Sequence, residues 1–193
     1  MESELKYLDI VEQPISMHPK KFALWLFLVT VLMIFAALTS AYIVRQAEGN
    51  WLEYELPEIF WVTSGIVLLS SVSMQVAYFA AKRDNFIGLR IAMVFTVLLG
   101  FAFLVGQWYS WVALVDREVF FVGNPAGSFL YVFTGLHALH LISGVIFLII
   151  VLISTFRYKV HSQALNTLEM ATTYWHFLGG LWLYLFLFLL LNH

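Results

Sequence analysis

Charged side chains are absent from five long stretches of this sequence. The stretches cover residues 22–44, 59–81, 91–115, 128–156 and 171–191, and each is at least 21 residues long. A helix of about 20 apolar residues crosses the roughly 30 Å hydrocarbon core of a bilayer. The pattern therefore predicts an all-α membrane protein, with five transmembrane helices packed in a bundle.

The composition excludes several other classes of protein. Only 11% of the 193 residues are charged and 62% are hydrophobic, whereas a typical soluble domain is about 25% charged. An ordinary soluble enzyme and a disordered chain are both excluded, and a net charge of −2 without a basic run argues against a nucleic-acid binder. The absence of Cys rules out thiolate metal sites and cysteine nucleophiles. Any function is therefore expected inside the helix bundle or on its surface.

The basic residues predict the orientation of the bundle. Two of them, Arg45 and Arg117, fall on one side, whereas eight fall on the other: Lys6, Lys20, Lys21, Lys82, Arg83, Arg90, Arg157 and Lys159. Short loops rich in Lys and Arg stay in the cytoplasm, so the N-terminus is expected to be cytoplasmic and the C-terminus outside. We accordingly expect a cytoplasmic N-terminal tail over residues 1–21 and a single membrane domain over residues 22–193.

Small and weakly polar side chains predict which helix faces meet, because lipid supplies no hydrophobic driving force between helices. In the third expected helix they form a stripe at spacings of three and four residues: Thr96, Gly100, Phe103, Gln107 and Ser110. The second expected helix has a similar stripe: Ser64, Leu68, Ser71, Gln75 and Tyr78. Both stripes are expected to face protein and the bulky apolar faces to meet lipid or a partner.

Three histidines lie within the expected spans: His137, His140 and His176. His140 and His176 fall at similar depths on neighbouring helices, as the two axial ligands of a membrane b-type haem would. The alternative is that these imidazoles are neutral and satisfy hydrogen bonds between helices. No Glu lies in any span, so the Glu-x-x-His pairs of a di-iron bundle are missing.

Several motifs occur in the order in which one known family carries them. The fourth span and its start contain Gly127-Ser128-Phe129, Thr134-Gly135-Leu136-His137-Ala138-Leu139-His140 and Gly144. The fifth span begins just after Glu169 and contains Tyr174-Trp175-His176-Phe177. Earlier in the chain, the matches are His18-Pro19, Phe60-Trp61-Val62-Thr63 and Leu99-Gly100. Together they resemble subunit III of haem-copper oxidases, the cytochrome c and quinol oxidase subunit III family, in its short five-helix bacterial form.

The resemblance implies an accessory subunit with no catalytic residues and no redox cofactor of its own. The haems and copper would lie in a partner, the catalytic subunit I, and subunit II, possibly with subunit IV, would complete a complex in the bacterial inner membrane. That complex would reduce O₂ and pump protons, while this chain stabilised it and held phospholipid in a cleft between helices. The expected structural and lipid-cleft residues are His137, His140, His176, Glu169, Trp175, Gln107, Arg83, Arg90 and Arg157, and the three arginines are expected near an anionic head group.

The sequence also departs from the family at three positions where many members keep a buried acid. Val31, Ser110 and Gly179 stand there instead. A role for this chain in buffering protons through those acids is therefore not expected, and the cost of burying their charge is removed. Three alternatives are an accessory subunit of a nitric-oxide reductase, an independent b-haem protein, and a small transporter. The transporter is disfavoured because no span carries a charge or an obvious proline break.

Overall fold

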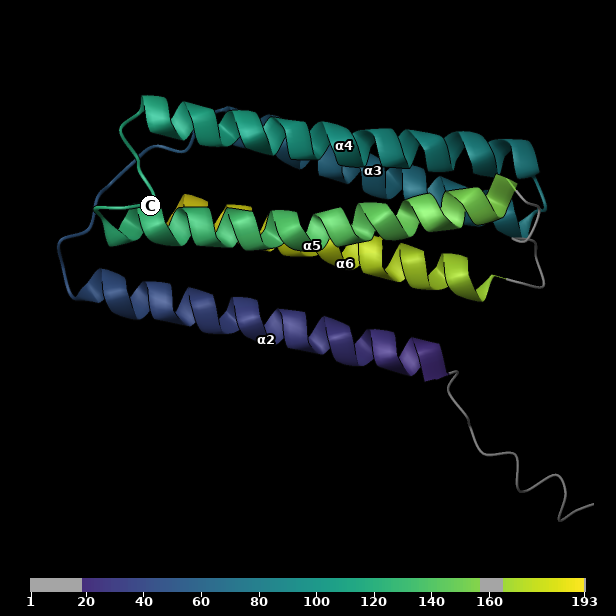
Figure 1. The fold of residues 1–193 in the computed structure, drawn as a ribbon, viewed down its shortest axis with the longest axis horizontal. Helices are drawn as coiled ribbons and strands as arrows, with labels where there is room; N and C mark the ends of the chain where they lie inside the picture. The colour runs from purple at the N-terminus through teal and green to yellow at the C-terminus, as the bar shows by residue number, and fades with distance from the viewer. Residues whose placement is uncertain (1–18, 157–164, 193) are drawn as a thin grey trace, which may run out of the picture.

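Five long helices make up the computed structural model, which describes residues 19–156 and 165–192. They are α2 (Pro19–Ala47), α3 (Ile59–Lys82), α4 (Phe86–Asp116), α5 (Pro125–Phe156) and α6 (Asn166–Leu191), and they run lengthwise beside one another (Figure 1). The described residues contain no strand. All five helices are long and apolar enough to cross a membrane, which confirms the expected all-α, five-helix fold.

Most of these helices extend beyond the charge-free stretches that predict them. Proline occupies the first position of both α2 and α5, where its missing N–H would have no helical partner in any case. At the start of α4 the Asn85 side chain accepts a hydrogen bond of 3.0 Å from the backbone N–H of Gly88, as an N-cap residue does. Local capping chemistry, and not the charge pattern, therefore sets these helix starts.

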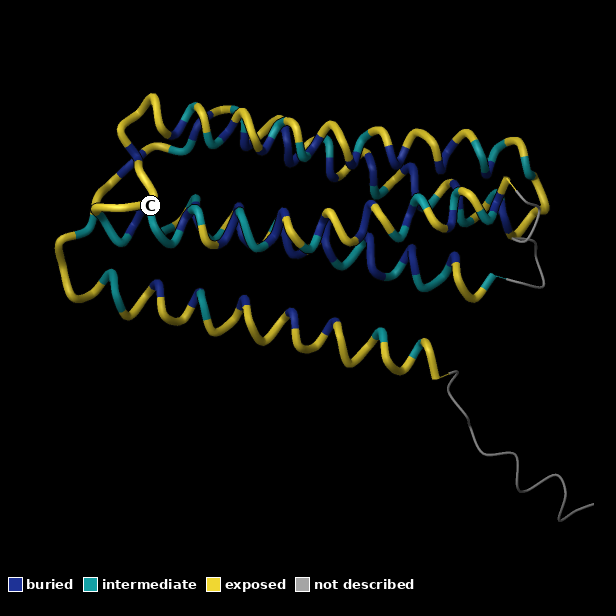
Figure 2. The backbone as a smooth tube through the Cα atoms, viewed as in Figure 1, coloured by how far each residue is buried: buried dark blue, intermediate teal, exposed yellow. Residues whose placement is uncertain are grey.

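The helices pack with α2 at the margin of the bundle. α3 contacts α4 and α6, while α5 contacts α4, α6 and α2. Within the described residues α2 contacts α5 and α6 but not α3 or α4, and it lies along one edge in Figure 1. Most of its residues are exposed, and one residue per turn is buried between Leu28 and Tyr42 (Figure 2). We therefore treat α2 as a helix attached to a bundle formed by the other four.

The predicted protein-facing stripes have different outcomes. All five members of the stripe on α4 are buried, which confirms that prediction. On α3 the prediction is wrong at Leu68, whose side chain is 51% exposed. The buried side of α3 is centred on Val67, Ser70 and Met74, because α4 and α6 pack against that side, roughly 130° around the helix from Leu68.

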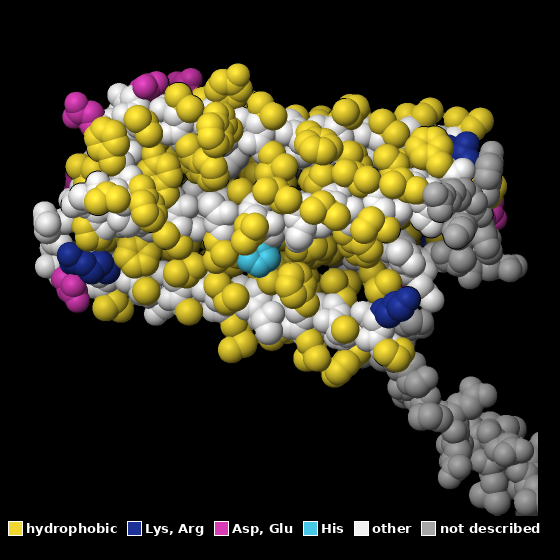
Figure 3. Space-filling model, viewed as in Figure 1, with side chains coloured by type: hydrophobic (Ala, Val, Ile, Leu, Met, Phe, Trp, Pro, Cys, Tyr) yellow, Lys and Arg dark blue, Asp and Glu magenta, His cyan; other side chains and the backbone are white. Residues whose placement is uncertain are grey.

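Charge is confined to the ends of the bundle. Figure 3 shows hydrophobic side chains along the visible face and charged side chains near its two ends. An odd number of helices places the end of α6 and the start of α2 at opposite ends (Figure 1). This distribution fits a bundle that spans a bilayer, and the direction in which it spans stays a prediction from the basic residues.

Candidate functional site

Trp175 is the point at which four helices meet. Its indole Nε1, on α6, donates a hydrogen bond of 3.1 Å to Ser70 Oγ on α3. A Cβ added at Gly100 of α4 would lie 2.9 Å from the indole, and one added at Gly144 of α5 would lie 3.4 Å from it. The two glycines therefore leave the space that the indole fills. Trp182 repeats the bond nearer the end of α6, since its Nε1 donates to Ser64 Oγ at 3.0 Å.

His137 is fully buried among aromatic rings from three other helices. Its ring centroid lies 5.2 Å from that of Trp182 on α6, 5.9 Å from Phe103 on α4 and 6.5 Å from Phe35 on α2. The side chain of Gln107, also on α4, is only 1% exposed. Two of the residues expected to organise the bundle thus lie at its centre.

His140 and His176 face different neighbours. The Nδ1 of His140 donates a hydrogen bond of 2.8 Å to the carbonyl of Leu136, and its ring lies beside Phe35 of α2 at 5.9 Å. The Nε2 of His176 instead donates to Oε1 of Gln75 on α3, at 3.1 Å. A haem would need both imidazoles directed at one iron atom. The observed contacts instead match histidines that satisfy hydrogen bonds within and between helices.

Glu169 links the start of α6 to the start of α2 and to the last turns of α3. Its Oε2 lies 2.6 Å from the Nζ of Lys21 on α2, and its Oε1 accepts a hydrogen bond of 3.3 Å from Tyr78 OH on α3. The ammonium of Lys82 lies 4.7 Å above the ring of Tyr78. Glu169 belongs to a sequence motif, whereas its partners do not, because no local pattern marks a contact between the first and last helices.

Polar contacts also attach the other end of α2 to α6. Tyr42 OH donates a hydrogen bond of 2.6 Å to the carbonyl of Asn192, and Gln46 donates to the same oxygen at 3.2 Å. Tyr184 OH on α6 donates to Thr39 Oγ1 at 3.1 Å. Sequence reasoning missed these residues, and the one available signal was the preference of Tyr for the ends of membrane helices.

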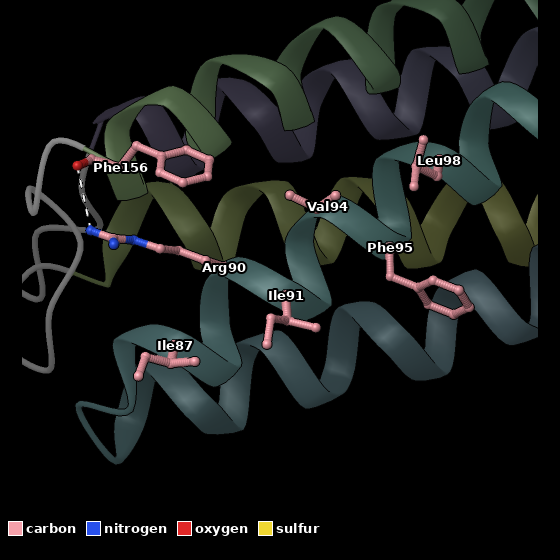
Figure 4. Close-up of a pocket in the computed structure, with 7 residues that line it drawn as sticks. All are labelled: Ile87, Arg90, Ile91, Val94, Phe95, Leu98 and Phe156. Carbon is pink, nitrogen blue, oxygen red and sulfur yellow. Dashed lines mark hydrogen bonds between the residues drawn. The ribbon is translucent and has the colours of Figure 1, made fainter.

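A groove lies beside Arg90, between α4 and the end of α5. It has a volume of about 510 Å³ and is lined by Ile87, Arg90, Ile91, Val94, Phe95, Leu98 and Phe156 (Figure 4). The Nη2 of Arg90 donates a hydrogen bond of 3.5 Å to the carbonyl of Phe156, and its guanidinium lies 5.2 Å from the Phe156 ring. Of the other predicted arginines, Arg83 is exposed and does not line this groove, and Arg157 lies outside the described residues.

The three positions without an acid are all buried and packed. Val31 is 1% exposed, and Ser110 donates a hydrogen bond of 2.9 Å to the carbonyl of Gly106. A Cβ added at Gly179 would lie 3.0 Å from Ser71 Oγ and 3.2 Å from Val67 Cγ1. A carboxylate side chain at position 179 would therefore press against Ser71 and Val67 of α3.

Residues 19–156 and 165–192 contain no group of three or more His, Asp or Glu side chains that could hold a metal ion. The candidate site consists of the contacts between helices and the surface groove beside Arg90.

Comparison with known proteins identifies the family. The model of the family described as cytochrome c oxidase subunit III matches residues 52–192, which is more than half of the chain. The chain belongs to the cytochrome c oxidase subunit III family. Its members are accessory subunits of haem-copper oxidases, so this chain is a subunit of such an oxidase.

Individual relatives in this family match most of the chain. A cytochrome c oxidase subunit 3 from Corynebacterium diphtheriae is 32% identical over 169 residues, which is 83% of this chain and 82% of that protein. A probable cytochrome c oxidase subunit 3 from Nocardia farcinica is 35% identical over 80% of this chain and 79% of its own length. A cytochrome c oxidase subunit 3 from Synechocystis is 31% identical over 88% of this chain and 75% of its own length.

Proposed function

We propose that this chain stabilises the catalytic subunit I of a haem-copper oxidase in a bacterial inner membrane, through packing and bound lipid. The observation that carries the proposal is the interior of the bundle, where Val31, Ser110 and Gly179 stand at the positions at which many relatives keep acids. Without a carboxylate at Val31, Ser110 or Gly179, these positions have no group that exchanges protons near neutral pH. Haem and copper would belong to the partner subunits, with the large exposed apolar faces available to those subunits and to lipid.

The groove beside Arg90 supports binding of an anionic phospholipid. Its apolar lining extends along α4 from Ile87 to Leu98, roughly 16 Å at 1.5 Å per residue. Arg90 lies near the start of α4, where a membrane helix meets the head groups, and the apolar side chains continue beyond it (Figure 4). A cation beside an apolar groove matches a negatively charged head group with an acyl chain attached. Arg83 and Arg157, which the sequence analysis grouped with Arg90, would add positive charge at the same membrane surface.

Removal of the chain tests the stabilising role. The intact oxidase and the same complex prepared without this subunit should start with similar activity, but the second should lose activity faster during turnover. Identical inactivation curves would refute the proposal.

Exchange of arginines tests the lipid role in the intact complex. Arg90→Gln should reduce the amount of anionic phospholipid that copurifies, as measured by native mass spectrometry, and should leave zwitterionic lipid unchanged. Arg83→Gln is the matched control, because it removes an equal charge from a side chain outside the groove. Equal loss in both variants would indicate general attraction of anionic lipid to a basic surface, and would count against a specific groove.

A further inference from the structure

Two buried polar side chains at the centre of the bundle make no hydrogen bond within the part of the chain that the structure describes. Neither the amide of Gln107 nor either ring nitrogen of His137 has one among residues 19–156 and 165–192. Nearby buried hydroxyls differ, since Thr134 donates to the carbonyl of Leu130 and Ser110 to that of Gly106. An unsatisfied buried polar group costs free energy, and nearly all such groups in native proteins find protein or water.

The packing of α4 against α5 places Gln107 and His137 at similar heights. Trp111 Nε1 donates a hydrogen bond of 2.9 Å to Thr134 Oγ1, and a Cβ added at Gly100 would lie 3.0 Å from Val145. Because the two helices are antiparallel, this register puts Gln107 level with Ala138, one residue from His137. The rise is 1.5 Å per residue, so the two side chains start within one helical turn of each other.

The three rings packed around His137 offer it no acceptor and no free donor. Phe35 and Phe103 have hydrocarbon rings, and Trp182 has a single N–H, which already donates to Ser64. These rings close the site from α2, α4 and α6. These rings therefore enclose His137, and the Gln107 side chain, at a similar height on α4, is only 1% exposed.

We infer that Gln107 and His137 bind a buried water molecule that links α4 to α5. A neutral imidazole has one donor and one acceptor nitrogen, and the amide supplies two N–H donors and a carbonyl acceptor. One water can bond a single ring nitrogen of His137 and the amide of Gln107 at once, donating to one group and accepting from the other, and buried waters make about three hydrogen bonds to otherwise unsatisfied polar atoms. The ligand class is water because the site offers neutral donors and acceptors and no charged side chain.

A cryo-electron microscopy map of the intact oxidase, at a resolution that shows ordered water, tests the inference directly. A density peak about 2.6–3.2 Å from both the Gln107 amide and a His137 ring nitrogen is expected. Two results would overturn it: a direct hydrogen bond between the two side chains, or a map with ordered water elsewhere but no peak here.

Paired variants supply a second readout in the same complex. Gln107→Leu and His137→Leu should each lower the temperature at which this subunit dissociates by about 2–4 °C. The double variant should lose less than the sum of the two, because it removes both polar groups that share the water. Ser110→Ala is the control, since its hydroxyl bonds within α4, and its effect should add to that of His137→Leu. Additive losses in the Gln107 and His137 variants would contradict a shared water. If a variant does not assemble, the map of the unaltered complex alone tests the inference.

Discussion

Lys21 in the first turn of α2 and Glu169 in the first turn of α6 form an ion pair across 148 residues of sequence, with Nζ 2.6 Å from Oε2. At the opposite end of α2, Tyr42 donates to the carbonyl of Asn192 just after α6. Polar contacts thus attach α2 to α6 at both ends of α2. Phe35 packs between them, against His137 and His140.

We expect Glu169→Gln and Lys21→Met each to weaken the attachment of α2 by up to about 1 kcal/mol. Both side chains are one-third exposed, so solvent screens the pair and limits its contribution. The measurement is the thermal dissociation of this subunit from the purified oxidase, at low and at high salt. The effect should shrink at high salt because ions screen exposed charges.

Lys20→Met is the matched control for this pair, because Lys20 is the neighbouring lysine and its side chain is exposed. It should change the dissociation temperature little. If the Lys20 and Lys21 variants behaved alike, net charge and not the ion pair with Glu169 would account for the effect.

Gly179→Ala should destabilise the bundle by about 1–3 kcal/mol, because the added methyl group would press against Ser71 and Val67 of α3. Gly180→Ala is a closely matched control: a Cβ there would meet nothing within 4 Å and would slightly favour the helix. The comparison requires only thermal unfolding of the two variants in the same complex. Equal stability of both would show that α3 and α6 are less closely packed than described.

Trp175→Phe should cost about 1–3 kcal/mol, through loss of the hydrogen bond to Ser70 and of indole volume between Gly100 and Gly144. The double variant Ser70→Ala, Trp175→Phe should lose less stability than the sum of the losses in the two single variants, because both changes remove the same hydrogen bond. Trp25→Phe alters an indole that is 55% exposed and should have little effect. If the stability lost by the double variant equalled the sum of the two single losses, the hydrogen bond between Trp175 and Ser70 would contribute nothing measurable.

The isolated chain should bind no b-type haem. His140 is directed toward α2 and His176 toward Gln75 on α3, so they do not supply two ligands to one iron. Addition of haem to the purified chain, followed by absorption spectroscopy, should show no Soret band of a bis-histidine complex. A band that disappeared in His140→Leu and His176→Leu would contradict this geometry.

Motif spacing anticipated some of the contacts between helices and missed others. The stripe from Thr96 to Ser110 on α4 was correct because α4 contacts α3 on one side and α5 on the other, so its small residues all meet protein. The stripe on α3 failed at Leu68, since periodicity gives a spacing but not the angle at which neighbours pack. Lys21 carried no signal, and Tyr42 carried only the preference of Tyr for the ends of membrane helices, because their partners lie at the far end of the chain.

The distribution of 22 charges along 193 residues was sufficient to predict five membrane helices, because hydrocarbon excludes charge and requires each backbone polar group to bond within its own helix. Family motifs were likewise readable from residue order alone. Which side chains meet could not be read in the same way. The fit of Trp175 among Gly100, Gly144 and Ser70 depends on the register and rotation of four helices. Lipid drives helices together only weakly, so close packing and a few hydrogen bonds select that arrangement.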